Sequence, residues 1–200
     1  MKVRDYNFHR PVRVMDLDPD KELNDKLLAV ARSRPELSDS AGPNLALIAE
    51  WWADRLVDKF MTCLRAYLKA MNTDKSPQVG LHIFFSHTID DSFVGCHDHV
   101  GDGDLVGIYY ARVPAEATYA ELPFGVGLYD PPPSSLVVYD PGAAGCYFLP
   151  DYQVICPQEN RLIIHPSVCP HLVTPGVGER LAVTCNFKAM LEDELLIKSL

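Results

Sequence analysis

Two regions with different hydrophobic periodicity divide the chain. In the first region, apolar residues recur every three or four positions, over residues 20–31 and again over residues 45–72. This spacing is typical of amphipathic helices that bury one face. The second pattern is long for a globular helix. Its length favours a helix that lies along a sheet or against a second subunit, so a homodimer is one expectation.

After Pro77 the pattern changes to short segments of β-branched and aromatic residues, separated by Gly, Pro and Asp. These segments predict strands at residues 79–88, 105–113, 136–139, 146–149, 161–165 and 180–187. Helices followed by strands, without alternation, predict a mainly β sandwich or barrel with N-terminal helices rather than a βαβ fold. The proline-rich run at residues 130–135 predicts a loop, because proline is excluded from central strands.

The length of 200 residues suits a single domain, with a mainly helical part over residues 1–75 and a β core over residues 76–190. The net charge of −9, from 18 basic and 27 acidic residues, argues against nucleic acid or an anionic membrane as the main partner. No apolar stretch is long enough to span a bilayer, and the N-terminus lacks a secretory signal. The six cysteines include no C-x-x-C pair. Reduced thiols and a cytoplasmic location are therefore expected.

Among the seven histidines, the pair His97 and His99 is the most informative. Residues two apart in a strand project to the same side, so these two imidazoles can bind one divalent transition metal. Alone, the H-x-H motif is weak evidence, since most such histidines lie on surfaces or in cores. His165 precedes a proline in an apolar segment, and a core position is the favoured interpretation for it.

The C-terminal strand carries a second candidate group. Arg180 opens this strand nine residues after His171, with a glycine-rich hairpin between them. Arg180, Thr184 and Asn186 share one face of the strand. An arginine followed by small and polar residues suits a polar pocket, where the guanidinium can hold a carboxylate in bidentate geometry. The alternative is an exposed arginine in a hairpin.

The order of these motifs resembles that of the 2-oxoglutarate/Fe(II) oxygenases. It comprises H-x-H at residues 97–99, the strand at residues 105–110, a turn ending in Pro170-His171, and Gly178-Glu179-Arg180. The resemblance covers about residues 79–188 and is greatest to the small bacterial and phage-type branch of the family. No single motif is decisive, but the ordered set is moderately specific.

The resemblance implies a double-stranded β-helix, the jelly-roll or cupin-like fold, with Fe(II) bound at its open end. His97 and His171 would be the two regular histidine ligands. Arg180 would hold the distal carboxylate of 2-oxoglutarate, helped by a hydroxyl from Tyr109, Tyr110 or Thr184. Three protein ligands leave three positions for the 2-oxo acid and dioxygen. The implied activity is oxidation of a small molecule, with no catalytic residue beyond the metal centre.

One position departs from the family pattern. The usual third ligand is the carboxylate of H-x-D, and His99 stands there. Three histidines can form the site, a nearby carboxylate such as Asp98, Asp102 or Asp104 can replace His99, or one position is open. A cupin-like three-histidine dioxygenase that uses O₂ without 2-oxoglutarate is a rival favoured by His99 and disfavoured by Arg180. A non-catalytic β-helix binding module is a second rival, although it would not need these converging groups.

Overall fold

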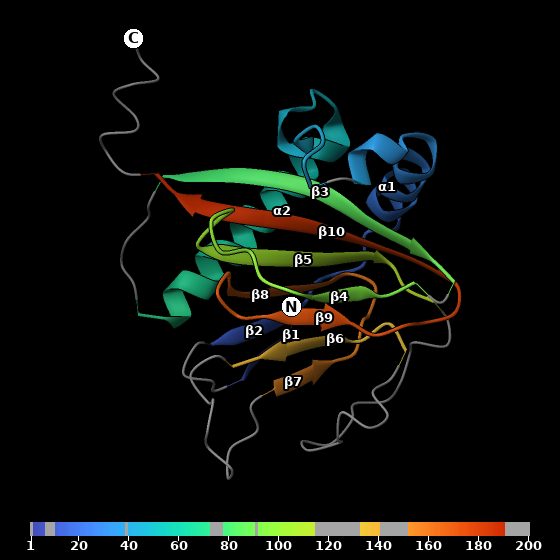
Figure 1. Ribbon diagram of the computed structural model, residues 1–200. Helices are drawn as coiled ribbons and strands as arrows, with labels where there is room; N and C mark the ends of the chain where they lie inside the picture. The colour runs from blue at the N-terminus through green and yellow to red at the C-terminus, as the bar shows by residue number, and fades with distance from the viewer. Residues whose placement is uncertain are drawn as a thin grey trace.

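The computed structural model describes residues 2–6, 11–38, 40–72, 78–90, 92–114, 133–140 and 152–190. Figure 1 shows two sheets facing each other, with the helices on the outer side of the larger one. The predicted strand at residues 146–149 lies outside the described residues, as does the first half of the predicted loop at 130–135.

Two α-helices precede most of the strands. Helix α1 spans Lys21–Ser33 and α2 spans Trp51–Ala70, with short 3₁₀ turns η1 at Pro35–Ser38 and η2 at Leu45–Leu47. The second helix therefore begins six residues later than the periodicity predicts. The cause is Asn44, whose Oδ1 accepts from the amides of Ala46 (3.0 Å) and Ile83 (2.9 Å). These bonds favour a capped 3₁₀ turn docked on the sheet.

No helix in the described part of the chain is long and apolar enough to cross a membrane.

The larger sheet has six antiparallel strands in the order β1-β2-β8-β5-β10-β3. Their bounds are Lys2–Tyr6, Val12–Asp16, Arg161–Pro166, Leu105–Arg112, Glu179–Ala189 and Val79–Ile89, respectively. Strands β1 and β2 add to the sequence analysis, which predicted a mainly helical N-terminal part and no strand before residue 79. They extend the sheet beyond β8, where Val14 pairs with Ile163.

The smaller sheet has four antiparallel strands in the order β4-β9-β6-β7. Their bounds are Val94–His97, His171–Val173, Leu136–Tyr139 and Tyr152–Ile155. From β3 onward the chain crosses repeatedly between the two sheets, which makes a double-stranded β-helix. The expected fold class, mainly β with N-terminal helices, is confirmed.

Two hydrophobic clusters lie on opposite sides of the larger sheet. One packs Trp52, Leu56 and Phe60 of α2 against its outer face, so this long helix lies along the sheet. The other fills the space between the sheets and includes Ile108 and Ala182. Along β10 alternate residues enter each layer. Its odd-numbered apolar residues face the helices, and its polar even-numbered residues face the space between the sheets.

Candidate metal centre

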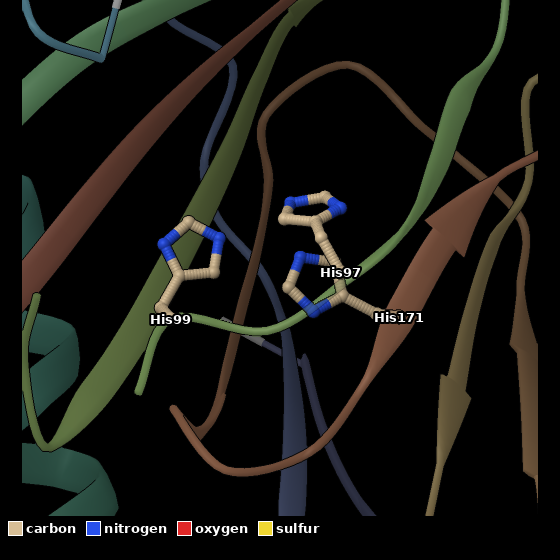
Figure 2. A group of neighbouring side chains, drawn as sticks. All are labelled: His97, His99 and His171. Carbon is tan, nitrogen blue, oxygen red and sulfur yellow. The ribbon is translucent and has the colours of Figure 1, made fainter. Parts of the chain in front are cut away.

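The three histidines singled out by the sequence meet between the sheets. His97 ends β4 and is paired directly with His171, the first residue of β9. His99 follows two residues after His97. One nitrogen from each ring lies within 4.8 Å of the others, which is close enough for a shared ion. Figure 2 shows the ring of His99 facing those of His97 and His171 from the other side of the site.

Backbone hydrogen bonds fix the loop that carries His99. The His99 amide donates to the Ser167 carbonyl (3.1 Å), and the His99 carbonyl accepts from the Asp102 amide (3.0 Å). This tight turn directs the His99 side chain inward, where it is 6 % exposed. The neighbouring His97 lies at the edge of the site and is exposed.

The buried imidazoles are held in their neutral form. Burial lowers the pKa of His99, with the nearby His97 adding to the effect. Burial also lowers the pKa of His171 to about 2 and that of His165 to about 4. A neutral imidazole has a free lone pair, which is the form that binds a metal. His165 stands behind this group with its ring centroid 4.8 Å from that of His171.

The metal-free protein is expected to lose stability as the pH falls below about 6.5, the ordinary pKa of histidine. In that range the unfolded chain takes up a proton at His165, whereas the folded protein, with a pKa of about 4 there, does not. The unfolded state binds more protons, so acid lowers the free energy of unfolding, by up to about 1.4 kcal/mol per pH unit for each such histidine.

Urea unfolding with a chelator present, between about pH 7 and pH 5, measures this slope. His165→Gln, which removes one titrating ring, should give a shallower slope than the parent chain. Equal slopes for the two proteins would contradict the assignment.

A cavity of about 320 Å³ opens beside the histidines. Besides them it is lined by apolar, hydroxyl-bearing and charged residues, namely Ser40, Phe84, Ser86, Val94, Asp98, Asp102, Ile108, Tyr110, Leu136, Val173, Arg180, Ala182 and Thr184. Strands β3, β4, β5, β6, β9 and β10 all contribute to this wall.

Arg180 is the buried cation of this cavity. It is 2 % exposed, and burial lowers the pKa of its guanidinium. Within the described part of the chain, its Nε has no hydrogen-bond partner, and the titratable group that acts on it is Tyr110 rather than a carboxylate. Leaving an N–H of a buried charged group without a partner is costly, so this guanidinium is suited to an anionic ligand in the cavity.

Tyr109, one of the expected co-substrate residues, faces away from the cavity. Its hydroxyl donates to Asn24 Oδ1 of α1 at 2.7 Å, on the outer side of the larger sheet. Because neighbouring residues of a strand alternate between its faces, Tyr110 points inward instead. Tyr110 and Thr184 line the cavity together with Arg180. The geometry therefore does not favour Tyr109 for the predicted role, which stays a prediction for Tyr110 and Thr184.

The aspartates near His99 lie outside the histidine group. Asp102 Oδ2 is 3.9 Å from His99 Nδ1, and its side chain is 65 % exposed. Asp104 Oδ2 accepts from the Ala189 amide (2.8 Å). Within the described residues, the group that can share an ion consists of the three histidines. Asp102 as a substitute ligand stays a prediction that the geometry does not favour.

The donor set fits a divalent transition metal. Three neutral imidazoles suit iron, zinc, copper or nickel, whereas magnesium and calcium prefer oxygen ligands. The buried guanidinium in the same cavity fits the carboxylate of a small acid. The site thus matches both groups that the sequence resemblance implies.

No family model matches the sequence, and no curated protein matches it in sequence. Solved structures match its fold. A Pseudomonas putida prolyl-4-hydroxylase is 15% identical with a TM-score of 0.59, and the match covers 90% of this chain and 88% of that one. The viral collagen prolyl hydroxylase from Paramecium bursaria Chlorella virus-1, in its 2-oxoglutarate complex, is 11% identical with a TM-score of 0.58, covering 90% and 96%. HygX from Streptomyces hygroscopicus, with nickel and 2-oxoglutarate bound, is 10% identical with a TM-score of 0.56, covering 90% and 82%. At such identities the likeness shows a shared fold.

Proposed function

We propose that the chain is a single-domain Fe(II)- and 2-oxoglutarate-dependent oxygenase that oxidises a small molecule. The observation that carries the proposal is the buried Arg180, which shares one cavity with the histidine group. A metal site alone needs no such cation. 2-Oxoglutarate needs both, because its 2-oxo acid end chelates the metal while its other end carries a second carboxylate.

Each group then has a defined task. His97, His99 and His171 hold the metal, and Arg180 binds the distal carboxylate of 2-oxoglutarate. Thr184 and Tyr110 line the same pocket with hydroxyl groups. Burial raises the pKa of Tyr110 to about 12, so its hydroxyl stays protonated and can donate to an anion. When bound, Fe(II) and 2-oxoglutarate supply, with dioxygen, the oxidising power for attack on a C–H bond of the substrate.

Charge supports an anionic co-substrate. Three neutral histidines leave the full charge of a divalent metal, where the usual site includes one compensating carboxylate. Arg180 adds a further positive charge in the cavity. The doubly negative 2-oxoglutarate would offset the charge of the metal and of Arg180, since within the described residues the metal group holds no carboxylate and none acts on Arg180. The protein's contribution is to orient these groups and to exclude water from between the sheets.

The volume of the cavity also limits the size of the substrate. Its volume of about 320 Å³ is at the lower end of small-molecule pockets, and 2-oxoglutarate would occupy part of it. A small substrate, oxidised at the open side near His97, fits this space better than a large one. A cytoplasmic location and a homodimer remain predictions. The length of α2 does not require a dimer, because this helix lies along the sheet.

The first test is anaerobic. Purified protein should bind stoichiometric Fe(II), and addition of 2-oxoglutarate should produce a weak metal-to-ligand charge-transfer band in the visible. Iron without any response to 2-oxoglutarate would favour the rival three-histidine dioxygenase. Protein that binds neither would favour the non-catalytic binding module and would end the proposal.

A further inference from the structure

The three histidines differ in what holds the ring nitrogen that faces away from the site. His97 Nδ1 lies 2.8 Å from the Gly95 carbonyl, and His171 Nδ1 lies 3.2 Å from the Cys169 carbonyl. A carbonyl only accepts, so each Nδ1 carries the proton and leaves Nε2 free for a metal. His99 Nδ1 is buried and has no hydrogen-bond partner among the residues that the structure describes. Its tautomer is thus the one that the backbone does not fix.

A second buried polar atom beside His99 also lacks a partner. Asn186 is 2 % exposed, and its Oδ1 is buried and accepts no hydrogen bond from the described part of the chain. It belongs to the inward face of β10, the face that carries Arg180 and Thr184. The Asn186 carboxamide contacts His99 closely enough to raise the pKa of His99, which offsets part of the effect of burial.

Local packing explains why these two side chains meet. The turn after His99 rests directly on β10, because the Asp104 amide donates to the Phe187 carbonyl (2.7 Å). A Cβ added to Gly103 would lie 2.8 Å from the Phe187 carbonyl oxygen and 3.3 Å from Asn186 Cβ. Only glycine allows this close approach, which brings His99 next to Asn186.

We propose that Asn186 is the positioning residue of His99, with Asn186 Oδ1 accepting a hydrogen bond from His99 Nδ1–H. This inference rests on the proposed metal centre. One hydrogen bond between them would satisfy two buried polar atoms that have no other partner in the described residues. It also leaves His99 Nε2 deprotonated and turned toward the other two rings, as Figure 2 shows for one nitrogen of His99. All three histidines then offer the same type of ligand atom.

Asp102 is the competing acceptor for His99 Nδ1. Its Oδ2 is 3.9 Å away, beyond hydrogen-bond distance, and its side chain is 65 % exposed to solvent. A carboxylate in water loses hydration when it takes a buried partner, so the contact is weak. The amide of Asn186 is already buried and gains a partner without that loss.

The tautomer can be measured in the metal-free protein. Long-range ¹H–¹⁵N NMR of ¹⁵N-histidine-labelled chain should show His99 protonated at Nδ1. Asn186→Leu, which has a similar shape but no acceptor, should give a mixture of tautomers. Asn186→Asp, which keeps an acceptor, should restore the parent spectrum, and the control Asp102→Asn should leave it unchanged. If His99 of the parent protein were protonated at Nε2 instead, that spectrum alone would overturn the proposal.

Metal affinity gives a second readout. In competition with a chelator, Zn²⁺ should bind Asn186→Leu ten- to hundredfold more weakly than the parent, a typical effect of losing the partner of a metal-bound histidine. Asn186→Asp should bind it at least as well as the parent. Asn186→Ala replaces the leucine variant if the latter does not fold. Parent-like affinity in the variant without an acceptor overturns the proposal.

The two readouts separate this inference from the proposed function. A parent protein that binds no metal would end the proposed function, while the spectra of the metal-free chain would still decide the role of Asn186. Conversely, parent-like spectra in Asn186→Leu would remove Asn186 from the site and leave the histidine group intact.

Discussion

Alanine in place of His99 is expected to remove most of the bound iron, whereas aspartate in its place should retain it. His99 supplies one of the three nitrogens that lie within 4.8 Å of one another, so its loss leaves two ligands. The decrease in affinity should exceed the ten- to hundredfold cost of removing a ligand's hydrogen-bond partner. His99→Asp creates the H-x-D arrangement of the family that the sequence resembles, and it should keep both iron and some 2-oxoglutarate decarboxylation. Metal analysis after dialysis, with chelator competition, measures the first effect.

Two further variants make the assignment specific. Asp102→Ala should retain iron, because its carboxylate lies outside the histidine group. His82→Ala removes a half-buried histidine of β3 that is not part of the group, and it should also retain iron. If His99→Ala kept its full iron content and Asp102→Ala bound no iron, the third metal ligand would be Asp102 and not His99.

Local periodicity was enough to predict most of the larger elements. The three-to-four spacing located α1 and most of α2, and the β-branched segments located β3, β5, β6, β8 and β10. The missed strands are short. Strand β9, for example, is His171–Val173, three residues whose extended form depends on pairing with both β4 and β6. Such non-local hydrogen bonds leave no periodic pattern in the sequence.

The same distinction explains which site residues could be predicted. His97 and His99 are two apart and share a side. The connection from β9 to β10 brings His171 and Arg180 to one cavity, but it crosses from the smaller sheet to the larger one and is not the hairpin that the sequence predicted. The choice between Tyr109 and Tyr110 could not be made from sequence. Strand β5 is covered by helices on one face and by the smaller sheet on the other, so nearly all its residues are buried and no alternation marks the inner face. The role of Asn186 depends on the turn at Gly103, which is again a non-local contact.

Arg180→Met is expected to weaken 2-oxoglutarate binding while leaving metal content nearly unchanged. A buried hydrogen bond between charged groups is typically worth about 1.5–3 kcal/mol, which corresponds to roughly a ten- to hundredfold loss of affinity. Arg180 lines the cavity but does not belong to the histidine group, so the metal should remain. Titration of the anaerobic Fe(II) protein with 2-oxoglutarate, followed by the visible band, measures the change.

Arg180→Met should not lower the stability of the metal-free protein, although it lowers the affinity for 2-oxoglutarate. In the metal-free chain Arg180 is 2 % exposed and its Nε has no partner in the described residues, so its guanidinium has a desolvation cost that no ligand offsets. Methionine fills a similar volume without a charge, and the free energy of unfolding of the empty protein should stay equal or rise. Arg112→Met, at the half-exposed end of β5, is the matched control and should change neither quantity appreciably. The opposite result would be parent-like 2-oxoglutarate affinity in Arg180→Met and weaker affinity in Arg112→Met. In that case the distal carboxylate of 2-oxoglutarate would lie at the outer end of β5, and Arg180 would not bind it.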